Sequence, residues 1–267
     1  MSDFPSTQEQ FFRRQKRHRR RVLFFRILVI AAFLLLWETA AHFGWIDDFI
    51  FSSPSRLFFC LIDLAKSGVI GQHIRVTLLE TIVSFLLVSG ITVLAVILLW
   101  SDKSVSETFE PYLVILNSLP KSALAPLLIV WLGANYRTII VTGMSVAIFG
   151  SILNLYQGFL SVDPDRIRLI ETLGGNRKNV LTKVILPANL PNLLSIMKVN
   201  VGLCLVGVVI GEFISSRAGL GYMIIYGSQV FKLDWVILGI VILCLIAMAL
   251  YQAIVLIEKW YLRRISG

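Results

Sequence analysis

Three long segments without a charged residue constrain the fold of this chain more than any other feature. They span residues 81–100, 138–162 and 235–257. About 20 residues in an α-helix rise about 30 Å, which matches the hydrocarbon thickness of a bilayer. Of the 267 residues, 57% are hydrophobic, against about 45–50% in a soluble domain. The sequence therefore predicts one helical membrane domain rather than one or two soluble domains.

Two further segments are long and apolar enough to cross a bilayer although they contain charged residues. Residues 22–41 contain Glu38 near their far end, and residues 192–214 contain Lys198 and Glu212. Glu38 is as compatible with a place at the membrane interface as with a place on a solute path. Both segments are therefore predicted to be membrane spans.

The remaining predicted span, residues 110–131, is the third in chain order and is interrupted by three prolines at positions 111, 120 and 126. Proline removes a helix hydrogen bond, and lipid offers no replacement for it. The backbone of this segment must therefore be covered by protein or line a cavity. The predicted fold is an all-α polytopic membrane protein with six transmembrane helices. Apolar residues at helical spacing in residues 55–66 predict a short interfacial helix as well.

Between the fourth and fifth spans, residues 163–187 are predicted to form a polar unit. Asp163 can cap free backbone N–H groups, and Pro164 suits the first position of a helix. Gly174 and Gly175 are typical of a helix end, because glycine accepts the left-handed conformation found there. The pattern predicts a helix that begins at Pro164 and stops at the two glycines.

A second short helix is predicted after this glycine corner. Asn176 can cap its start. Leu186 followed by Pro187 is expected to end it, because the residue before a proline is disfavoured in the helical conformation. The polar unit thus consists of a helix, a tight corner and a second helix, with no obvious catalytic group. It is typical of a docking element.

Positive charge is unevenly distributed along the chain and predicts its orientation. The net charge is +9, and residues 13–21 form a dense basic block directly before the first span. Six spans place both termini on one side, which carries 17 of the 25 Lys and Arg residues, against six on the other side. The positive-inside rule then places both termini and the polar unit in the cytoplasm. A nucleic-acid or lipid-specific role for the basic block is the less favoured alternative.

Three parts make up the predicted domain organisation. Residues 1–21 are a basic cytoplasmic N-terminal segment, residues 22–260 a single transmembrane domain that includes the polar unit, and residues 261–267 a cytoplasmic tail. The three cysteines are well separated in the sequence. They therefore predict neither a disulfide framework nor a metal cluster.

Polar residues inside the spans are candidates for a solute path, because a charge in a membrane is costly and seldom faces lipid. Lys198 and Glu212 are 14 positions apart, on one helix face and about 21 Å from each other. Glu212 is expected to help form an outer gate, and Lys198 or Asn200 to meet an anionic solute. Either charged side chain could instead reach to the membrane surface.

The broken span supplies the other candidates for the solute path. Asn117 and Ser118 could line the same cavity. Lys121 is a third basic candidate, although its position beside Pro120 favours a role in holding the broken span in place.

Two alternative function classes lack the motifs that they require. A secondary transporter predicts paired acids within spans and an inverted repeat. An intramembrane enzyme needs a nucleophile–base pair or metal ligands, such as an H-E-x-x-H or G-x-S-x-G motif. The sequence shows none of these clearly. It also has no G-x-x-x-x-G-K-[ST] phosphate loop, so an ATP-driven transporter built on this chain needs a separate ATPase.

The polar unit contains a glycine and a proline-ending segment at a distinctive spacing. Gly174 is followed, after nine residues, by Val184-Ile185-Leu186-Pro187. This resembles the cytoplasmic loop of bacterial ABC importer permeases, whose pattern is E-A-A, three residues, G, nine residues and I-x-L-P. The first half of the pattern differs, because Arg168-Leu169-Ile170 stands where E-A-A is usual.

Further segments along most of the chain resemble the nitrate/sulfonate/taurine branch of these permeases. They occur in the order and at the spacing of that branch: Trp37-Glu38, Pro54-Ser55, residues 119–126, residues 131–133, and Gly211-Glu212-Phe213 with residues 219–222 after it.

The resemblance implies the fold of a type I ABC importer permease in a bacterial inner membrane. Two copies of the permease, two cytoplasmic ATPase subunits and a separate solute-binding protein would act together. ATP and Mg would be bound by the ATPase, and this chain would hold no cofactor. The implied ATPase-coupling residues are Arg168, Glu171, Gly174, Gly175, Asn176, Leu186 and Pro187.

Arg168 reverses the charge that is usual at its position in these permeases. Either the ATPase surface has changed to suit it, or Glu171, one turn further on, supplies the acidic group. Both residues lie on one helix face and could also pair with each other. The branch carries nitrate, sulfonates, taurine, bicarbonate or vitamin precursors, so the solute is left open, and the basic residues within the spans favour an anion.

Overall fold

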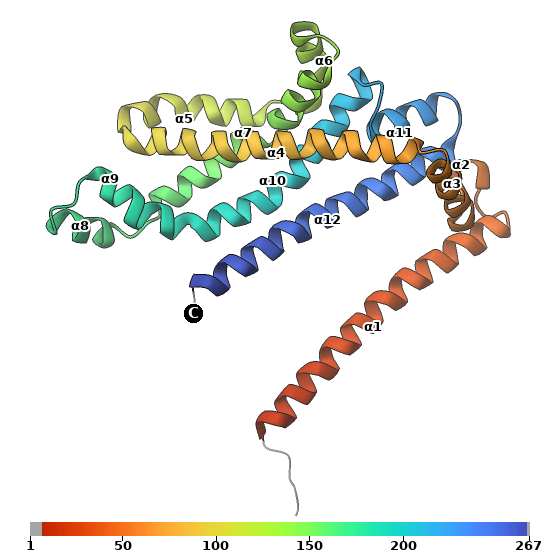
Figure 1. The fold of residues 1–267 in the computed structure, drawn as a ribbon, viewed down its shortest axis with the longest axis horizontal. Coiled ribbons are helices and arrows are strands. Elements are labelled where there is room, and N and C mark those ends of the chain that lie inside the picture. Colours follow the sequence, from red (N-terminus) through yellow and green to blue (C-terminus); the bar gives the residue numbers. More distant parts are fainter. Residues whose placement is uncertain (1–6, 266–267) are drawn as a thin grey trace, which may run out of the picture. The chain divides into compact units, whose positions relative to one another are not determined.

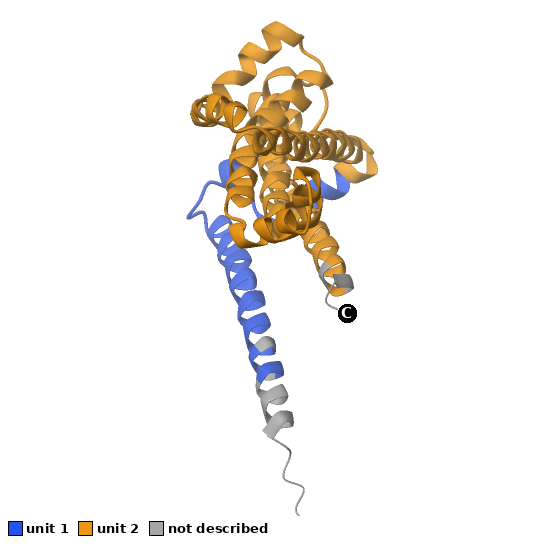
Figure 2. Ribbon diagram, turned by 90° about the vertical axis from the view of Figure 1, so that its left-hand side faces the viewer, with its two compact units in different colours: residues 1–63 blue, residues 64–267 orange. Residues whose placement is uncertain are grey.

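A computed structural model describes residues 7–265 of the chain, and within this range every regular element is a helix. The chain forms two compact units, residues 1–63 and residues 64–267 (Figure 2). The all-α fold predicted from the sequence is confirmed. The N-terminal segment 1–21 and the tail 261–267 extend beyond the described residues at positions 1–6 and 266–267.

The first unit consists of a long helix followed by a short one and the beginning of a third. α1 covers Thr7–His42, α2 covers Asp48–Phe51, and α3 begins at Pro54 and ends at Lys66. α1 contains a candidate membrane span at Arg20–His42. The basic segment is therefore helical from Thr7 onward and continues into the span without a break. α3 confirms the helix predicted at residues 55–66.

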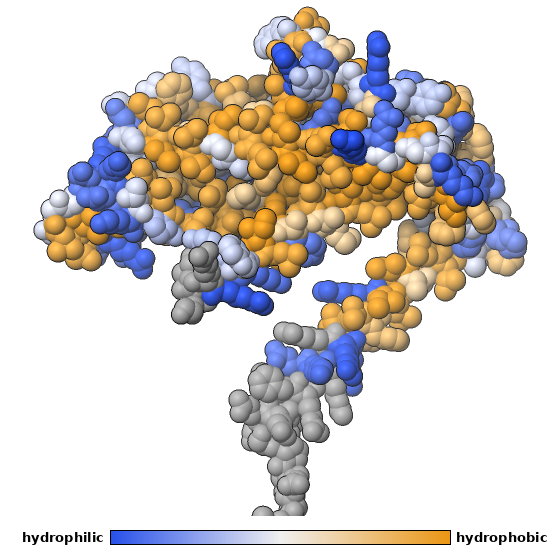
Figure 3. Space-filling view, viewed as in Figure 1, coloured by the Kyte–Doolittle hydropathy of each residue, from blue (hydrophilic) through white to orange (hydrophobic). Residues whose placement is uncertain are grey.

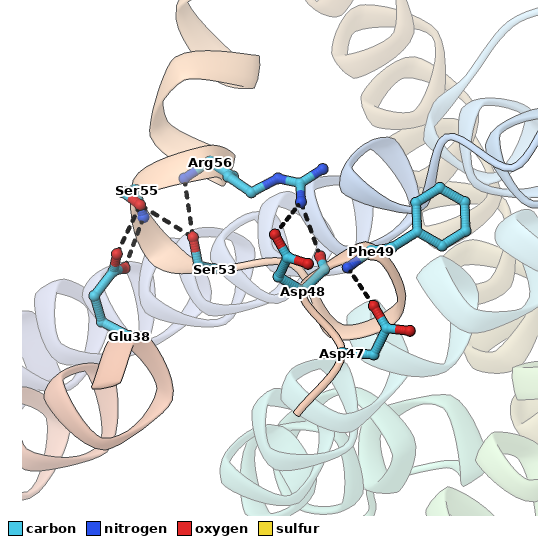
Figure 4. Close-up of polar contacts among 7 residues, drawn as sticks. All are labelled: Glu38, Asp47, Asp48, Phe49, Ser53, Ser55 and Arg56. Atoms are coloured by element: carbon cyan, nitrogen blue, oxygen red, sulfur yellow. Dashed lines mark hydrogen bonds and ion pairs between the residues drawn. The ribbon is translucent and has the colours of Figure 1, made fainter. Parts of the chain in front are cut away.

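Within this unit, Glu38 of α1 fastens the start of α3 (Figure 4). Its carboxylate accepts hydrogen bonds from the Ser55 backbone N–H at 3.0 Å and from the Ser55 hydroxyl at 2.7 Å. The first N–H groups of a helix have no partner within it, and a negative charge there is favoured by the helix dipole. A second contact is an ion pair in which the Nη1 atom of Arg56 lies 3.0 Å from the Oδ2 atom of Asp48. Trp37-Glu38 and Pro54-Ser55, distant in sequence, are thus parts of one junction.

The second unit is a bundle centred on three long helices (Figure 1). α7 packs against both α4 and α10, and α10 also contacts α4. α12 packs against α10 and α11, and α5 and α6 pack against α7. The bounds are α4 Val69–Ser101, α5 Lys103–Ser118, α6 Lys121–Leu132, α7 Tyr136–Leu160, α8 Pro164–Thr172, α9 Arg177–Val180, η1 Leu181–Ile185, α10 Leu186–Ser215, α11 Leu220–Gln229 and α12 Leu233–Ile265.

Among the described residues, five helices are long and apolar enough to span a membrane, and a bent pair gives a possible sixth. This pair is α5 with α6, which meet at an angle of 99°. The bend falls at Leu119 and Pro120, where the sequence predicted the break. α4 begins at Val69, twelve residues before the predicted start of its span at residue 81. Its first twelve residues include His73, Thr77 and Glu80, and all three are buried within the protein.

The surface of this unit is suited to lipid. Leucines on α4 project outward, among them Leu86, Leu94 and Leu98, each with at least 60% of its surface exposed. Figure 3 shows apolar side chains across the face formed by α4 and α12, and hydrophilic side chains gathered at α8 and α9. An exposed apolar surface of this extent indicates burial in a membrane or against other proteins.

Glycines bring α7 and α10 unusually close together. Gly207 and Gly211 are four residues apart on α10, the small-residue spacing that lets membrane helices approach. A Cβ on Gly207 would lie 2.8 Å from the Cα of Gly143 and 2.9 Å from the carbonyl oxygen of Thr142, both on α7. The central contact of the bundle therefore requires glycine at position 207.

We expect the substitution Gly207→Ala to destabilise the bundle by about 1–3 kcal/mol, because the added methyl group forces two backbones apart. The matched control is Gly202→Ala on the same helix, where a Cβ would have no neighbour within 4 Å. Thermal unfolding followed by circular dichroism in detergent compares the two variants. Equal midpoints would show that the close approach is not needed.

Candidate functional site

The polar unit, residues 163–187, begins as the sequence predicts. Asp163 caps α8 by accepting a hydrogen bond from the Asp165 N–H at 2.9 Å. α8 ends at Thr172, and Gly174 has a φ of +79°, in the left-handed region. The predicted glycine corner is confirmed.

Gly174 and Gly175 serve the corner in different ways. A Cβ on Gly174 would meet no atom within 4 Å, so this position needs glycine for its backbone conformation alone. A Cβ on Gly175 would lie 2.7 Å from the carbonyl oxygen of Ile170. The Gly175 N–H donates to that same oxygen at 2.8 Å. The second glycine therefore permits the close approach that closes the corner.

The second helix starts as predicted but does not end where predicted. Asn176 caps it by accepting a hydrogen bond from the Asn179 N–H at 3.0 Å. The sequence predicted an end at Leu186-Pro187, whereas α9, η1 and α10 form one helix from Arg177 to Ser215.

A turn of π-helix explains this difference. In a regular helix the ring of Pro187 would clash with the carbonyl group four residues before it. In η1 the Leu186 N–H donates to the carbonyl oxygen of Leu181, five residues back, so the turn is wider. The wider turn directly before Pro187 lets the helix continue into the membrane span.

Charged and apolar side chains cover the free surface of the polar unit. Arg168 forms an ion pair with Asp165, with 3.7 Å between the Nη1 and Oδ1 atoms, and Glu171 is exposed. Leu169 and Leu173 are 59% and 76% exposed. A hollow of about 370 Å³ lies between α8 and the start of α10, lined by Arg166, Leu169, Ile170, Lys183, Val184, Pro187 and Ala188.

The polar unit is firmly attached to the bundle. Val180 and Ile185 are almost fully buried in a core cluster with residues of α4 and α7. Arg177 donates a hydrogen bond to the carbonyl oxygen of Trp100 at 3.0 Å, and its guanidinium lies 5.2 Å from the centre of the Trp100 ring. No sequence pattern pointed to Arg177 or Trp100, because they are 77 positions apart.

At the other end of α4, Glu212 forms the centre of a buried polar cluster. Its side chain is fully buried, and its carboxylate accepts hydrogen bonds from the Thr77 hydroxyl at 2.7 Å and the Gly221 N–H at 2.6 Å. Thr77 in turn accepts from the Leu220 N–H at 2.8 Å. Glu80, 7% exposed, lies beside Glu212.

The Glu212 cluster fixes the loop between α10 and α11. The Gly219 N–H donates to Nδ1 of His73 at 3.0 Å. A Cβ on Gly221 would lie 2.8 Å from a carboxylate oxygen of Glu212. The loop glycines therefore fit against the carboxylate with no room for a side chain. Sequence reasoning selected Glu212 and interpreted His73 as structural or interfacial. It did not select Thr77 or Glu80, whose one signal was their polarity just before an apolar segment.

Lys198 is paired with a residue that the sequence analysis did not select. Its Nζ atom lies 3.0 Å from both carboxylate oxygens of Glu258 on α12, and each side chain is 19% exposed. Asn200, two residues further on, is buried and accepts a hydrogen bond from the Ser151 hydroxyl of α7 at 2.7 Å. Lys198 therefore faces α12, whereas Asn200 faces α7.

The residues at the broken span support the bend. Lys121 donates to the carbonyl oxygens of Leu116 and Asn117 at the end of α5. A cation at this position compensates the negative end of the helix dipole. Ser118 donates to the Val114 carbonyl oxygen at 2.9 Å.

Two of the predicted path residues, Asn117 and Asn200, come close to one level of α7. The side-chain oxygen of Asn117 lies 3.1 Å from where a Cβ of Gly150 would stand, and Asn200 contacts the adjacent Ser151. Lys198 is two positions from Asn200. Glu212 is twelve residues beyond Asn200, which is about 18 Å along the helix. The structure therefore separates Glu212 from the other candidates. No group of three or more His, Cys, Asp or Glu residues suited to a metal ion occurs in the described part of the chain.

Comparisons with known proteins give the family. Residues 90–267 match the family described as "Binding-protein-dependent transport system inner membrane component". A probable ABC transporter permease protein of Haemophilus influenzae is 30% identical over 238 residues, which cover 89% of this chain and 95% of that protein. A putative aliphatic sulfonates transport permease protein of Bacillus subtilis is 26% identical, with 97% of this chain and 94% of that protein covered.

Solved structures give the same fold. Inward-facing MetNI, a methionine ABC transporter, matches with a TM-score of 0.63 and 18% identity, covering 73% of this chain and 97% of that chain. The importer-permease fold expected from the resemblance is confirmed, and the family match covers more than half of the sequence. The chain therefore belongs to the inner membrane components of binding-protein-dependent transport systems.

Proposed function

We propose that this ABC permease carries a small anion delivered by a separate solute-binding protein, and that its polar unit receives the ATPase that drives transport. The observation that carries the proposal is the construction of the polar unit. It exposes Leu169 and Leu173, while Val180 and Ile185 anchor its second helix in the core. An element that is rigidly attached to the spans and presents apolar side chains is suited to receive force from a partner.

Charge distribution and motif content support the same assembly. The excess of Lys and Arg on the side of the termini favours a cytoplasmic place for the polar unit, in a bacterial inner membrane. The sequence lacks a phosphate loop, so ATP and Mg would be held by the ATPase subunits. Two copies of the permease with two ATPase subunits give each polar unit one ATPase.

The hollow in the polar unit indicates the chemistry of the docking contact. Its lining combines apolar side chains with two cations, Arg166 and Lys183. A carboxylate from the ATPase would be attracted by both cations. This arrangement supports the first of the two explanations for Arg168, an ATPase surface that has changed to suit basic residues.

The path for the solute would run along α7 and α10. Asn117 and Asn200 lie near one level of α7, and Ser118 and Lys121 line the adjacent bend. Lys198 is the basic group on α10 that would meet an anion once it separates from Glu258. Glu212 would act at the outer gate by holding the loop between α10 and α11. Relatives are named for aliphatic sulfonates and for taurine, so a sulfonate is the first solute to test.

Reconstitution in lipid nanodiscs tests the proposal as a whole. The permease, co-expressed with the ATPase and the binding protein of its own organism, should retain the ATPase on purification. ATP hydrolysis should rise when binding protein loaded with a sulfonate is added. Purification without any ATPase, together with transport driven by a proton gradient alone, would instead identify a secondary transporter.

Charge reversal tests the docking hollow. The double substitution Arg166→Glu and Lys183→Glu should lower recovery of the ATPase by about tenfold or more, because two attractive contacts become repulsive. Lys178→Glu is the matched control, since Lys178 is an exposed cation of the same unit that does not line the hollow. Because the control changes the charge by half as much, a loss in the control half as large on a logarithmic scale would mean that only the overall charge of the unit matters.

Substitutions at the ion pair between Lys198 of α10 and Glu258 of α12 test the proposed solute path. Lys198→Ala and Glu258→Ala each leave one mostly buried charge unpaired, so both should reduce stability. The double variant should recover stability but not the uptake of a sulfonate, because the basic group is still absent. Full recovery of uptake in the double variant would show that Lys198 has only a structural role. Thermal unfolding and radiolabelled uptake provide the two measurements.

A further inference from the structure

α4 connects the polar unit with the Glu212 cluster. Trp100, one residue before the end of α4, contacts Arg177 of the polar unit. Thr77, near the beginning of α4, contacts both Glu212 and Leu220. The 23 positions between Thr77 and Trp100 correspond to about 35 Å of helix. One helix without a break therefore reaches both candidate regions.

Arg177 meets the end of α4 in three ways at once. It donates a hydrogen bond to the Trp100 carbonyl, which is one of the last four carbonyl groups and has no partner within the helix. Its positive charge lies at the negative end of the helix dipole. Its guanidinium also lies over the Trp100 ring, a cation–π contact. Lysine cannot make the planar, multi-donor contact that arginine makes here.

The position of Arg177 makes this contact more than an anchor. It is the first residue of α9, directly after the Asn176 cap and the glycine corner. On its other side the π-turn of Leu181–Ile185 separates it from α10. A π-turn is a place where a helix adjusts its winding. Val180 and Ile185 join this segment to the core cluster, and the Arg177 contact joins it separately to the end of α4.

We propose that Arg177 is a positioning residue for transport. It transmits movement of the polar unit to α4, and Thr77 passes that movement to the loop at residues 219–221. The contact between Arg177 and Trp100 connects one end of α4 to the polar unit, and the contacts of Thr77 connect the other end to the Glu212 cluster. This inference rests on the proposed function, since the driving movement comes from the ATPase.

The test compares substitutions at the contact between Arg177 and Trp100 with a control substitution at the neighbouring Lys178, all in the complete complex. Arg177→Ala removes all three contacts, Arg177→Lys keeps the charge, and Trp100→Leu removes the ring but keeps the carbonyl group. Lys178→Ala changes the adjacent exposed cation. The readouts are recovery of the ATPase, basal ATP hydrolysis, hydrolysis stimulated by loaded binding protein, and sulfonate uptake.

Arg177→Ala should keep the ATPase and its basal hydrolysis, while stimulated hydrolysis and uptake fall by about threefold or more relative to Lys178→Ala. Arg177→Lys should recover part of that loss, and Trp100→Leu should fall between the alanine variant and the wild type. If Arg177→Ala is unstable, Trp100→Leu carries the test by itself, with the same split between basal and stimulated hydrolysis.

Stimulation and uptake equal to those of Lys178→Ala would overturn the inference. Loss of the ATPase itself in Arg177→Ala would also overturn it, because Arg177 would then be a docking contact. A wild-type protein that recovers no ATPase would instead overturn the proposed function, and the inference with it. The behaviour of the wild type thus distinguishes the two failures.

Discussion

A carboxylate enclosed in a membrane bundle must find its hydrogen-bond donors within the protein, because lipid supplies none. Glu212 meets this requirement with the Thr77 hydroxyl and the Gly221 N–H. Several other features depend on that arrangement. α4 must extend beyond its apolar segment to bring Thr77 into place, and Gly221 must lack a side chain. The loop between α10 and α11 is therefore held by a buried acidic group that needs hydrogen-bond donors.

Features encoded by neighbouring residues were predictable from the sequence. The glycine corner at Gly174, the cap at Asn176 and the break at Pro120 each depend on the conformational preferences of one or two residues. Contacts between distant positions were not predictable in this way. Glu212 and Thr77 are 135 positions apart, and Lys198 and Glu258 are 60 apart. Sequence reasoning found one member of each pair, because a charge in an apolar segment is conspicuous by itself.

Pro187 shows how a local rule can fail without any distant contact. Proline is incompatible with a regular helix because its ring meets a carbonyl group one turn earlier. The chain avoids the clash by widening the preceding turn, with the Leu186 N–H bonded to Leu181. Burial of Val180, directly before this turn, and of Ile185, its last residue, holds the segment helical. The packing of the core thus keeps the polar unit continuous with α10, where the sequence predicted a separation.

The pairing of Lys198 with Glu258 sets a condition on transport of an anion. An anion that binds Lys198 must replace a carboxylate already in contact with it at 3.0 Å, in a setting where both side chains are mostly buried. Attraction between opposite charges is strong in such a setting, so exchange without any movement would be costly. Separation of α10 from α12 would lower that cost by admitting water to Glu258. Movement of these two helices would then be needed to expose the basic group.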